Sequence, residues 1–129
     1  DYACWIFGTP KKHSSIIRSS SSLKITASDY ASYHFEYPQF TASLTLNYFR
    51  RKSKREIEVV SEQGTLTADL INNKVINDEG LVLFEAPDFT IMDTYVDQMS
   101  YFVNLLKSKK KGMNDLGESL EILKICLNK

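Results

Sequence analysis

The sequence of 129 residues contains few of the residue types that mark a catalytic or metal centre. It has two cysteines, Cys4 and Cys126, and two histidines, His13 and His34, and none of these stands in a CxxC or other metal-ligand spacing. The GxSxG, GxGxxG, P-loop and HExxH motifs are also missing. We therefore expect no complete active site, no metal site and no catalytic residue in this chain. The two distant thiols are expected to be reduced and buried, as is usual in the cytoplasm.

An excess of charge of one sign is missing as well, because 16 Lys and Arg residues balance 16 Asp and Glu residues. Domains that bind nucleic acid are usually basic overall, so we expect no nucleic-acid partner. No apolar run approaches the length of about 20 residues that a membrane-spanning helix needs. No signal peptide is recognisable. The sequence therefore predicts a cytoplasmic location and no membrane partner.

Apolar residues are plentiful, and their spacing predicts strands through the first two thirds of the chain. Hydrophobic residues make up 43% of the sequence, enough for the core of one domain. Alternation predicts an edge strand within residues 11–22 and a strand over residues 29–37, with Tyr33, Phe35 and Tyr37 on one face. Two short strands are expected at residues 75–76 and 81–84. An open aromatic face on the strand over residues 29–37 would be a normal dimer surface.

The stretch from Phe40 to Leu70 is expected to contain two or three antiparallel strands around a basic turn and a glycine turn. Apolar and polar residues alternate from Phe40 to Tyr48, which is the period of a half-buried strand. A strand rich in β-branched residues follows over Arg55–Ser61. Gly64 can adopt the positive φ of a tight hairpin, after which Thr65–Ile71 would return as a third strand.

Helices are expected at both ends of the chain. Residues 1–7 read as the end of a helix that closes at Gly8. An apolar stripe at helical spacing predicts a second, core-facing helix over residues 95–106. Asp115 and Glu118 form a capping box ahead of a last helix, whose buried stripe would be Leu116, Leu120, Leu123 and Leu127. The predicted fold class is α+β: a mostly antiparallel, open-faced sheet with helices packed on one face.

The best candidate for a binding site is the basic segment 50–55, which we define by its five cations: Arg50, Arg51, Lys52, Lys54 and Arg55. Clustered Arg and Lys side chains can bind phosphate or carboxylate, and Arg does so with two hydrogen bonds. The alternative is a solvated hairpin loop, or ion pairs with Glu56 and Glu58. The lysine run at residues 107–111 is explained as a solvated helix end.

Several motifs, taken in their order along the chain, resemble the C-terminal domain of the Gfo/Idh/MocA oxidoreductases, the glucose-fructose oxidoreductase and inositol dehydrogenase family. The pieces are Asp1–Gly8, similar to the helix end H-x-x-D…W-x-x-G; Ser28–Ala31, similar to x-D-x-A; Arg55–Leu66, similar to R-x-x-x-I-x-G-E-x-G-T-L; Tyr95–Phe102, similar to Y-x-D/E-x-x-x-F; and Leu116–Leu127, similar to the closing helix. The chain departs from the family at Ser61, where Gly is frequent, and at Asn47, where Asp is frequent.

The resemblance implies that residues 1–129 are a single substrate and oligomerisation domain, a fragment of a two-domain enzyme. A missing N-terminal Rossmann domain would bind NAD or NADP, so this chain is expected to bind no cofactor itself. The family's catalytic histidine would lie just upstream of Asp1, and its catalytic lysine in the missing domain. Asp1 is carried over as a neighbour of the substrate. A homo-oligomer is expected to form through the open sheet face.

The resemblance also implies a substrate class. Tyr48, Arg51 and Arg55 look like the Y-x-x-R-x…R pattern of members that oxidise nucleotide-linked or acidic amino sugars. A substrate carrying phosphate or carboxylate would suit these cations. The expected reaction is hydride transfer from a sugar C–H to the nicotinamide.

Two other functions stay open on the sequence alone. One is a non-enzymatic α+β binding or assembly module that docks an acidic partner on the basic segment 50–55. The other is a small hydrolase or isomerase, although the sequence offers no convincing acid/base pair for it. Fold class does not separate these functions.

Overall fold

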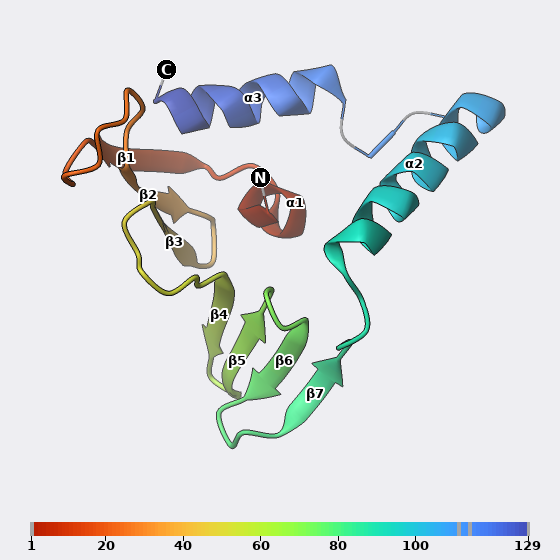
Figure 1. The fold of residues 1–129 in the computed structure, drawn as a ribbon, viewed down its shortest axis with the longest axis horizontal. Coiled ribbons are helices and arrows are strands. Elements are labelled where there is room, and N and C mark those ends of the chain that lie inside the picture. Colours follow the sequence, from red (N-terminus) through yellow and green to blue (C-terminus); the bar gives the residue numbers. More distant parts are fainter. Residues whose placement is uncertain (1, 111, 114, 129) are drawn as a thin grey trace. The chain divides into compact units, whose positions relative to one another are not determined.

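The computed structural model describes residues 2–110, 112–113 and 115–128, and it is an α+β structure (Figure 1). The elements in chain order are α1 (Tyr2–Phe7), β1 (Lys12–Arg18), β2 (Tyr30–Glu36), β3 (Thr41–Asn47), β4 (Glu56–Ser61), β5 (Gly64–Asp69), β6 (Lys74–Asn77), β7 (Val82–Glu85), α2 (Ile91–Ser108) and α3 (Leu116–Leu127). The strands form two antiparallel sheets, in the orders β1-β2-β3 (sheet A) and β4-β5-β6-β7 (sheet B). The α+β class with antiparallel strands is therefore confirmed.

The chain divides into two compact units, which we describe separately. Unit 1 comprises Asp1–Arg51 and Gly112–Lys129, and unit 2 comprises Lys52–Lys111. The expected hairpin around the basic segment 50–55 does not form, because β3 pairs with β2 while β4 pairs with β5. The segment instead links the two sheets. Five like charges and no glycine in six residues disfavour a tight turn at this place.

The core of unit 1 lies between sheet A and the two helices of this unit. The buried apolar residues are Tyr33, Phe35 and Tyr37 of the strand region and Ile125 of α3, and Ala3 and Cys4 of α1 pack against them. The Tyr33 hydroxyl donates to the Cys126 carbonyl at 2.9 Å, and burial raises the pKa of Tyr33 above its usual range. The prediction that these aromatics form an open face for a partner is wrong, because α1 and α3 of the same chain cover them.

The Tyr37 side chain fixes how α1 ends. Its hydroxyl donates to the Gly8 carbonyl at 3.1 Å. Gly8 adopts φ +78° and its N–H donates to the Cys4 carbonyl at 2.9 Å, as expected for a residue that ends a helix. The Phe40 ring stacks on Tyr37 at 4.5 Å, and Phe7 meets the Phe40 ring edge-on at 5.1 Å. The expected helix end before Gly8 is thus confirmed, while Asp1 itself lies outside the described residues.

Asp29 anchors the serine-rich loop that connects β1 to β2. Its side chain is 1% exposed, and its carboxylate accepts hydrogen bonds from the Ser20 N–H (2.7 Å), the Ser21 N–H (2.9 Å) and the Ser21 hydroxyl. The hydroxyl of Ser21 and the backbone of Ser20 hold the pKa of Asp29 below its ordinary value of 3.8. The loop is therefore tied to the start of β2 by an ionised carboxylate.

Unit 2 contains sheet B and α2, and none of its residues 52–110 is buried. Alternate side chains put Ile57, Leu66, Ala68, Val75 and Phe84 on one face of the sheet. Asn73 holds the chain that leads into α2, because its side-chain amide donates to the Phe89 carbonyl at 2.7 Å. Thr90 and Asp93 then form a capping box that begins the helix.

The apolar stripes of the last two helices were predicted to be core residues, and both predictions are wrong. In α2 all residues of the expected stripe are exposed, and only one of them is less than half exposed, Val103 at 37%; the others are Tyr95, Met99, Phe102 and Leu106. In α3 the capping box of Asp115 and Glu118 is confirmed, but Leu116 is 86% exposed and the buried residue is Ile125. Helical spacing fixes which residues share a face, and it does not fix which face meets the sheet.

The turn between β4 and β5 depends on glycine at position 64. Gly64 adopts φ +126°, and a Cβ placed there would lie 2.8 Å from Oδ2 of Asp78. We expect Gly64→Ala to lower the free energy of unfolding by about 1–3 kcal/mol, through backbone strain and this contact. Urea denaturation followed by circular dichroism measures the change. Gly80→Ala is the matched control, because Gly80 also has a positive φ of +81° but has no atom within 4 Å of its Cβ position. An equal loss in both variants would contradict the role of the Asp78 contact.

The Asp29 anchor predicts a pH dependence. A carboxylate with a lowered pKa stabilises the fold at pH values above its ordinary value of 3.8, and this contribution is lost as the pH falls through the lower folded value. In an NMR pH titration, the Ser20 and Ser21 amide signals should change with a midpoint below 3.8. Asp29→Asn should remove this transition. A midpoint at or above 3.8 in the unmodified chain would show that the carboxylate is not held ionised by the loop.

Candidate functional site

The four predicted site residues are distributed over the chain as follows. Asp1 lies outside the described residues. Tyr48 and Arg51 follow β3 in unit 1, whereas Arg55 precedes β4 in unit 2, where its carbonyl accepts from the Leu70 N–H at 2.9 Å. Tyr48 and Arg51 therefore both lie in the segment that leaves one end of sheet A, whereas Arg55 belongs to the other unit.

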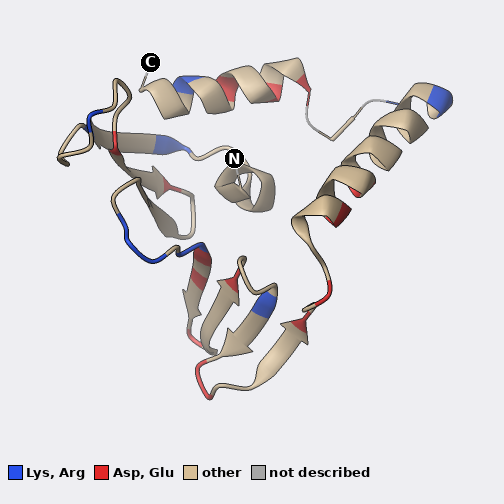
Figure 2. Cartoon of the chain, viewed as in Figure 1, with Lys and Arg blue, Asp and Glu red and all other residues tan. Residues whose placement is uncertain are grey.

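The basic segment 50–55 is exposed along its whole length (Figure 2). Lys54 forms an ion pair with Glu56 at 2.6 Å, as the solvated-loop alternative expected. Arg50 and Arg51 form no ion pair with any of the described residues. Charge compensation is therefore partial, and the two arginines that follow β3 are available to an anion.

The register of sheet A places a third arginine at the same end. Arg18, the last residue of β1, lies opposite Tyr30, which in turn lies opposite Asn47 at the end of β3. Residues opposite each other on antiparallel strands point to the same face, so these three side chains share one face of the sheet. Sequence reasoning missed Arg18 because only the strand pairing connects it to Tyr48 and Arg51.

Aromatic rings accompany these cations. The Tyr30 and Phe49 rings stack with their centroids 6.5 Å apart and an angle of 21° between their planes. Tyr48 is 73% exposed, and its N–H donates to the Asp29 carbonyl at 3.0 Å, which holds the end of β3 beside the start of β2. This end of sheet A therefore presents aromatic and guanidinium groups together.

Asp29 is the acidic residue closest in sequence to this end of sheet A. Its carboxylate does not lie at the surface, where it could neutralise the arginines. The Asp29 carboxylate is buried and accepts its hydrogen bonds from Ser20 and Ser21. At the opposite end of β1, Lys12 lies within 4.0 Å of the Glu36 carboxylate. Among the described residues, positive charge thus forms no ion pair at the Arg18 end and is partly compensated at the Lys12 end.

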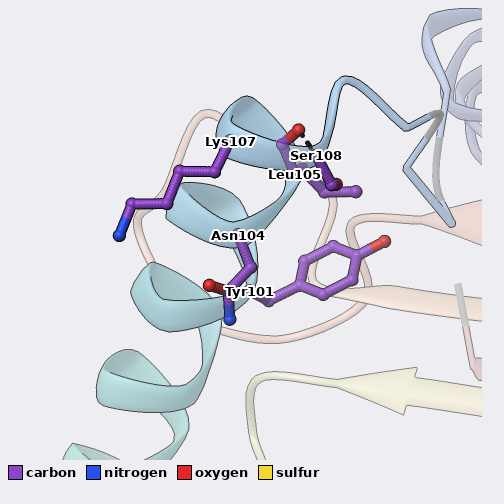
Figure 3. Close-up of a pocket in the computed structure, with 5 residues that line it drawn as sticks. All are labelled: Tyr101, Asn104, Leu105, Lys107 and Ser108. Atoms are coloured by element: carbon purple, nitrogen blue, oxygen red, sulfur yellow. Dashed lines mark hydrogen bonds between the residues drawn. The ribbon is translucent and has the colours of Figure 1, made fainter.

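Two hollows in the described chain lie elsewhere. One of about 400 Å³ runs along α2 and is lined by Tyr101, Asn104, Leu105, Lys107 and Ser108 (Figure 3). All five belong to one helix, and Figure 3 shows Lys107 and Tyr101 pointing to opposite sides of it, so no functional groups converge there. A second, apolar hollow of about 330 Å³ lies in unit 2 beside Val75, Phe84 and Phe89.

The histidines and cysteines do not converge on a reactive centre in the described residues. Nδ1 of His34 lies 3.1 Å from the Ser43 hydroxyl on the polar face of sheet A. Both thiols are free; Cys4 is partly buried, and Cys126 is exposed, which corrects the expectation that both are buried. Residues 2–110, 112–113 and 115–128 contain no cluster of three or more His, Cys, Asp and Glu side chains able to hold a metal ion.

No helix in the described part of the chain combines the length and the apolar character needed to cross a membrane. Comparisons with models of known protein families, with curated proteins and with solved structures each found no match to this chain.

Proposed function

We propose that this chain is the substrate-binding and oligomerisation domain of an NAD(P)-dependent oxidoreductase that acts on an anionic sugar, either nucleotide-linked or an acidic amino sugar. The observation that carries the proposal is the pair of exposed arginines, Arg50 and Arg51, that have no ion pair with the described residues and follow the exposed Tyr48. Guanidinium groups suit the phosphate or carboxylate of such a sugar. The motif order described above supplies the link to the oxidoreductase class.

The residues of this chain do not fit a dinucleotide cofactor. Both sheets are antiparallel, and the sequence has no GxGxxG turn between a strand and a helix. Under this proposal a preceding domain would hold NAD or NADP, and the nicotinamide would supply the oxidising chemistry. The part played by this chain is to bind the anionic group of the sugar and to orient the sugar ring.

Self-association belongs to the same proposal, and the structure limits which face can serve. The aromatic face of sheet A is covered by α1 and α3, so the face that stays open carries the exposed residues Ser14, His34 and Ser43. A homo-oligomer would use this polar face rather than the aromatic one.

The first test is a fluorescence titration with NADH and NADPH. We expect no binding to the present chain and binding to a version extended upstream to its natural start, because the cofactor site would lie in the added residues. Failure of the extended version to bind either nucleotide would reject the dehydrogenase. A pull-down with an acidic peptide would then examine the alternative of a non-enzymatic docking module on the basic segment 50–55.

The second test concerns the arginines. In the extended enzyme, Arg50→Ala combined with Arg51→Ala should raise KM for an anionic sugar about tenfold, with a smaller effect on kcat, because each lost charge-assisted contact weakens substrate binding. Lys54→Ala is the matched control, since Lys54 is already paired with Glu56. Equal KM values in the double variant and the control would remove these arginines from the site.

A further inference from the structure

We infer that the outer side of α3 binds a second copy of this chain, helix against antiparallel helix. The contact is made by the leucine stripe of α3, which consists of Leu116, Leu120, Leu123 and Leu127. The inference goes beyond the proposed function, because the contact needs neither a cofactor nor a sugar. The leucine stripe also differs from the polar face of sheet A, so variants on the two surfaces can be told apart.

The first step is that α3 has two apolar sides, of which sheet A covers one. Ile125 is 8% exposed and packs with Tyr33 and Phe35, so this side of the helix faces the sheet. Helical spacing places the leucine stripe on the opposite side. Its four residues, in chain order, are 86%, 49%, 51% and 52% exposed. A helix that is apolar on both sides is normally buried on both, so the outer side of α3 is suited to a further partner.

The second step is that α1 enlarges the apolar surface. Ala3 and Cys4 pack against the aromatic residues of sheet A, so α1 covers the same face of the sheet as α3 does. Helical spacing places Trp5 and Ile6 on the side of α1 away from the sheet, where they are 70% and 46% exposed. A fully exposed Trp side chain offers about 200 Å², so these two residues and the leucine stripe together expose apolar surface on the order of 600 Å². Two such surfaces would bury on the order of 1,200 Å², which is the lower limit for a stable interface.

The third step identifies the partner as a second copy. The leucines of the stripe are separated by four, three and four residues, and this spacing reads the same in both directions. An antiparallel copy therefore places Leu116 against Leu127 of the second copy, and Leu120 against Leu123 of the second copy. A two-fold interface requires this kind of self-complementarity. The antiparallel arrangement also sets the positively polarised N-terminus of each helix beside the negatively polarised C-terminus of the other.

The residues that flank the leucine stripe permit a close contact. Gly117, Ser119 and Cys126 are small, so the backbones of two helices can approach each other. Lys124 also flanks the stripe, and it forms an ion pair with Glu121 of its own helix at 2.6 Å. The lysine charge therefore keeps its counter-charge in the contact, whereas burial of an unpaired charge would oppose association.

Sedimentation equilibrium of the present chain over a range of concentrations tests the inference. Because the buried area is at the lower limit for a stable interface, we expect a monomer–dimer equilibrium with a dissociation constant in the micromolar range. Leu120→Glu combined with Leu123→Glu should weaken the dimer about a hundredfold, since four carboxylates would then meet at the centre of the contact. A chain that stays monomeric up to a concentration of about 1 mM would overturn the inference.

Two further variants show which surface makes the contact. Leu106→Glu is the matched control, since Leu106 is also an exposed leucine of a helix but belongs to α2. His34→Glu places the same charge on the polar face of sheet A. Both variants should dimerise as the unmodified chain does. Dissociation of the dimer by Leu106→Glu or His34→Glu, with no effect of the double variant in α3, would assign the contact to α2 or to the sheet and would refute the inference.

Nuclear Overhauser effects between copies of the unmodified chain make the test independent of the folding of any variant. In a mixture of isotope-labelled and unlabelled chains, the methyl groups of Leu116 should contact those of Leu127 in the other copy. Contacts of Leu116 with Leu116 would indicate a parallel pair and would contradict the antiparallel register. The result is also separable from the nicotinamide titration. A dimer through α3 without NADH binding by the extended protein would keep this surface and reject the dehydrogenase, whereas a monomer with NADH binding would do the reverse.

Discussion

The packing of Ile125 against Tyr33 and Phe35 is the contact on which unit 1 depends. It joins a strand near the start of the chain to a helix at its end, so the two sequence segments of unit 1 fold as one body. Burial of apolar surface is the main favourable term in folding, and these aromatic residues are the largest side chains that the chain buries. The Tyr33 hydroxyl is satisfied by the Cys126 carbonyl at 2.9 Å, so burying this ring leaves no polar group unpaired.

Unit 2 is stabilised differently, because none of residues 52–110 is buried. Local geometry takes the place of a core there. Gly64 permits the first hairpin, the Asp69 carboxylate accepts from the N–H groups of Ile71 and Asn72, and Asn73 ties the chain before α2 to sheet B. The apolar face of sheet B is not buried. It therefore contributes less hydrophobic stabilisation than the aromatic face of sheet A does.

Sequence periodicity predicted the elements well and their partners poorly. Alternation located β1, β2 and β3, and cap chemistry located the start of α3, because both signals are local. The alternation of residues within β4 does not determine that it pairs with β5 and not with β3. The exposure of Leu116 likewise depends on how α3 packs against the rest of the unit. In the candidate site, Arg51 was predicted from a local cluster of cations and Tyr48 from a family resemblance, whereas Arg18 required the register between β1 and β2.

Burial and charge act together at that end of sheet A. A carboxylate on the surface beside Arg18 would form an ion pair with it and would compete with any anionic ligand. Asp29 cannot do this while its carboxylate is buried and accepts three hydrogen bonds from Ser20 and Ser21. The serine-rich loop thus satisfies the acid internally while the acid holds the backbone of β1 and β3 in place. The positive potential of the arginines therefore extends into solvent, where a phosphate group would meet it first.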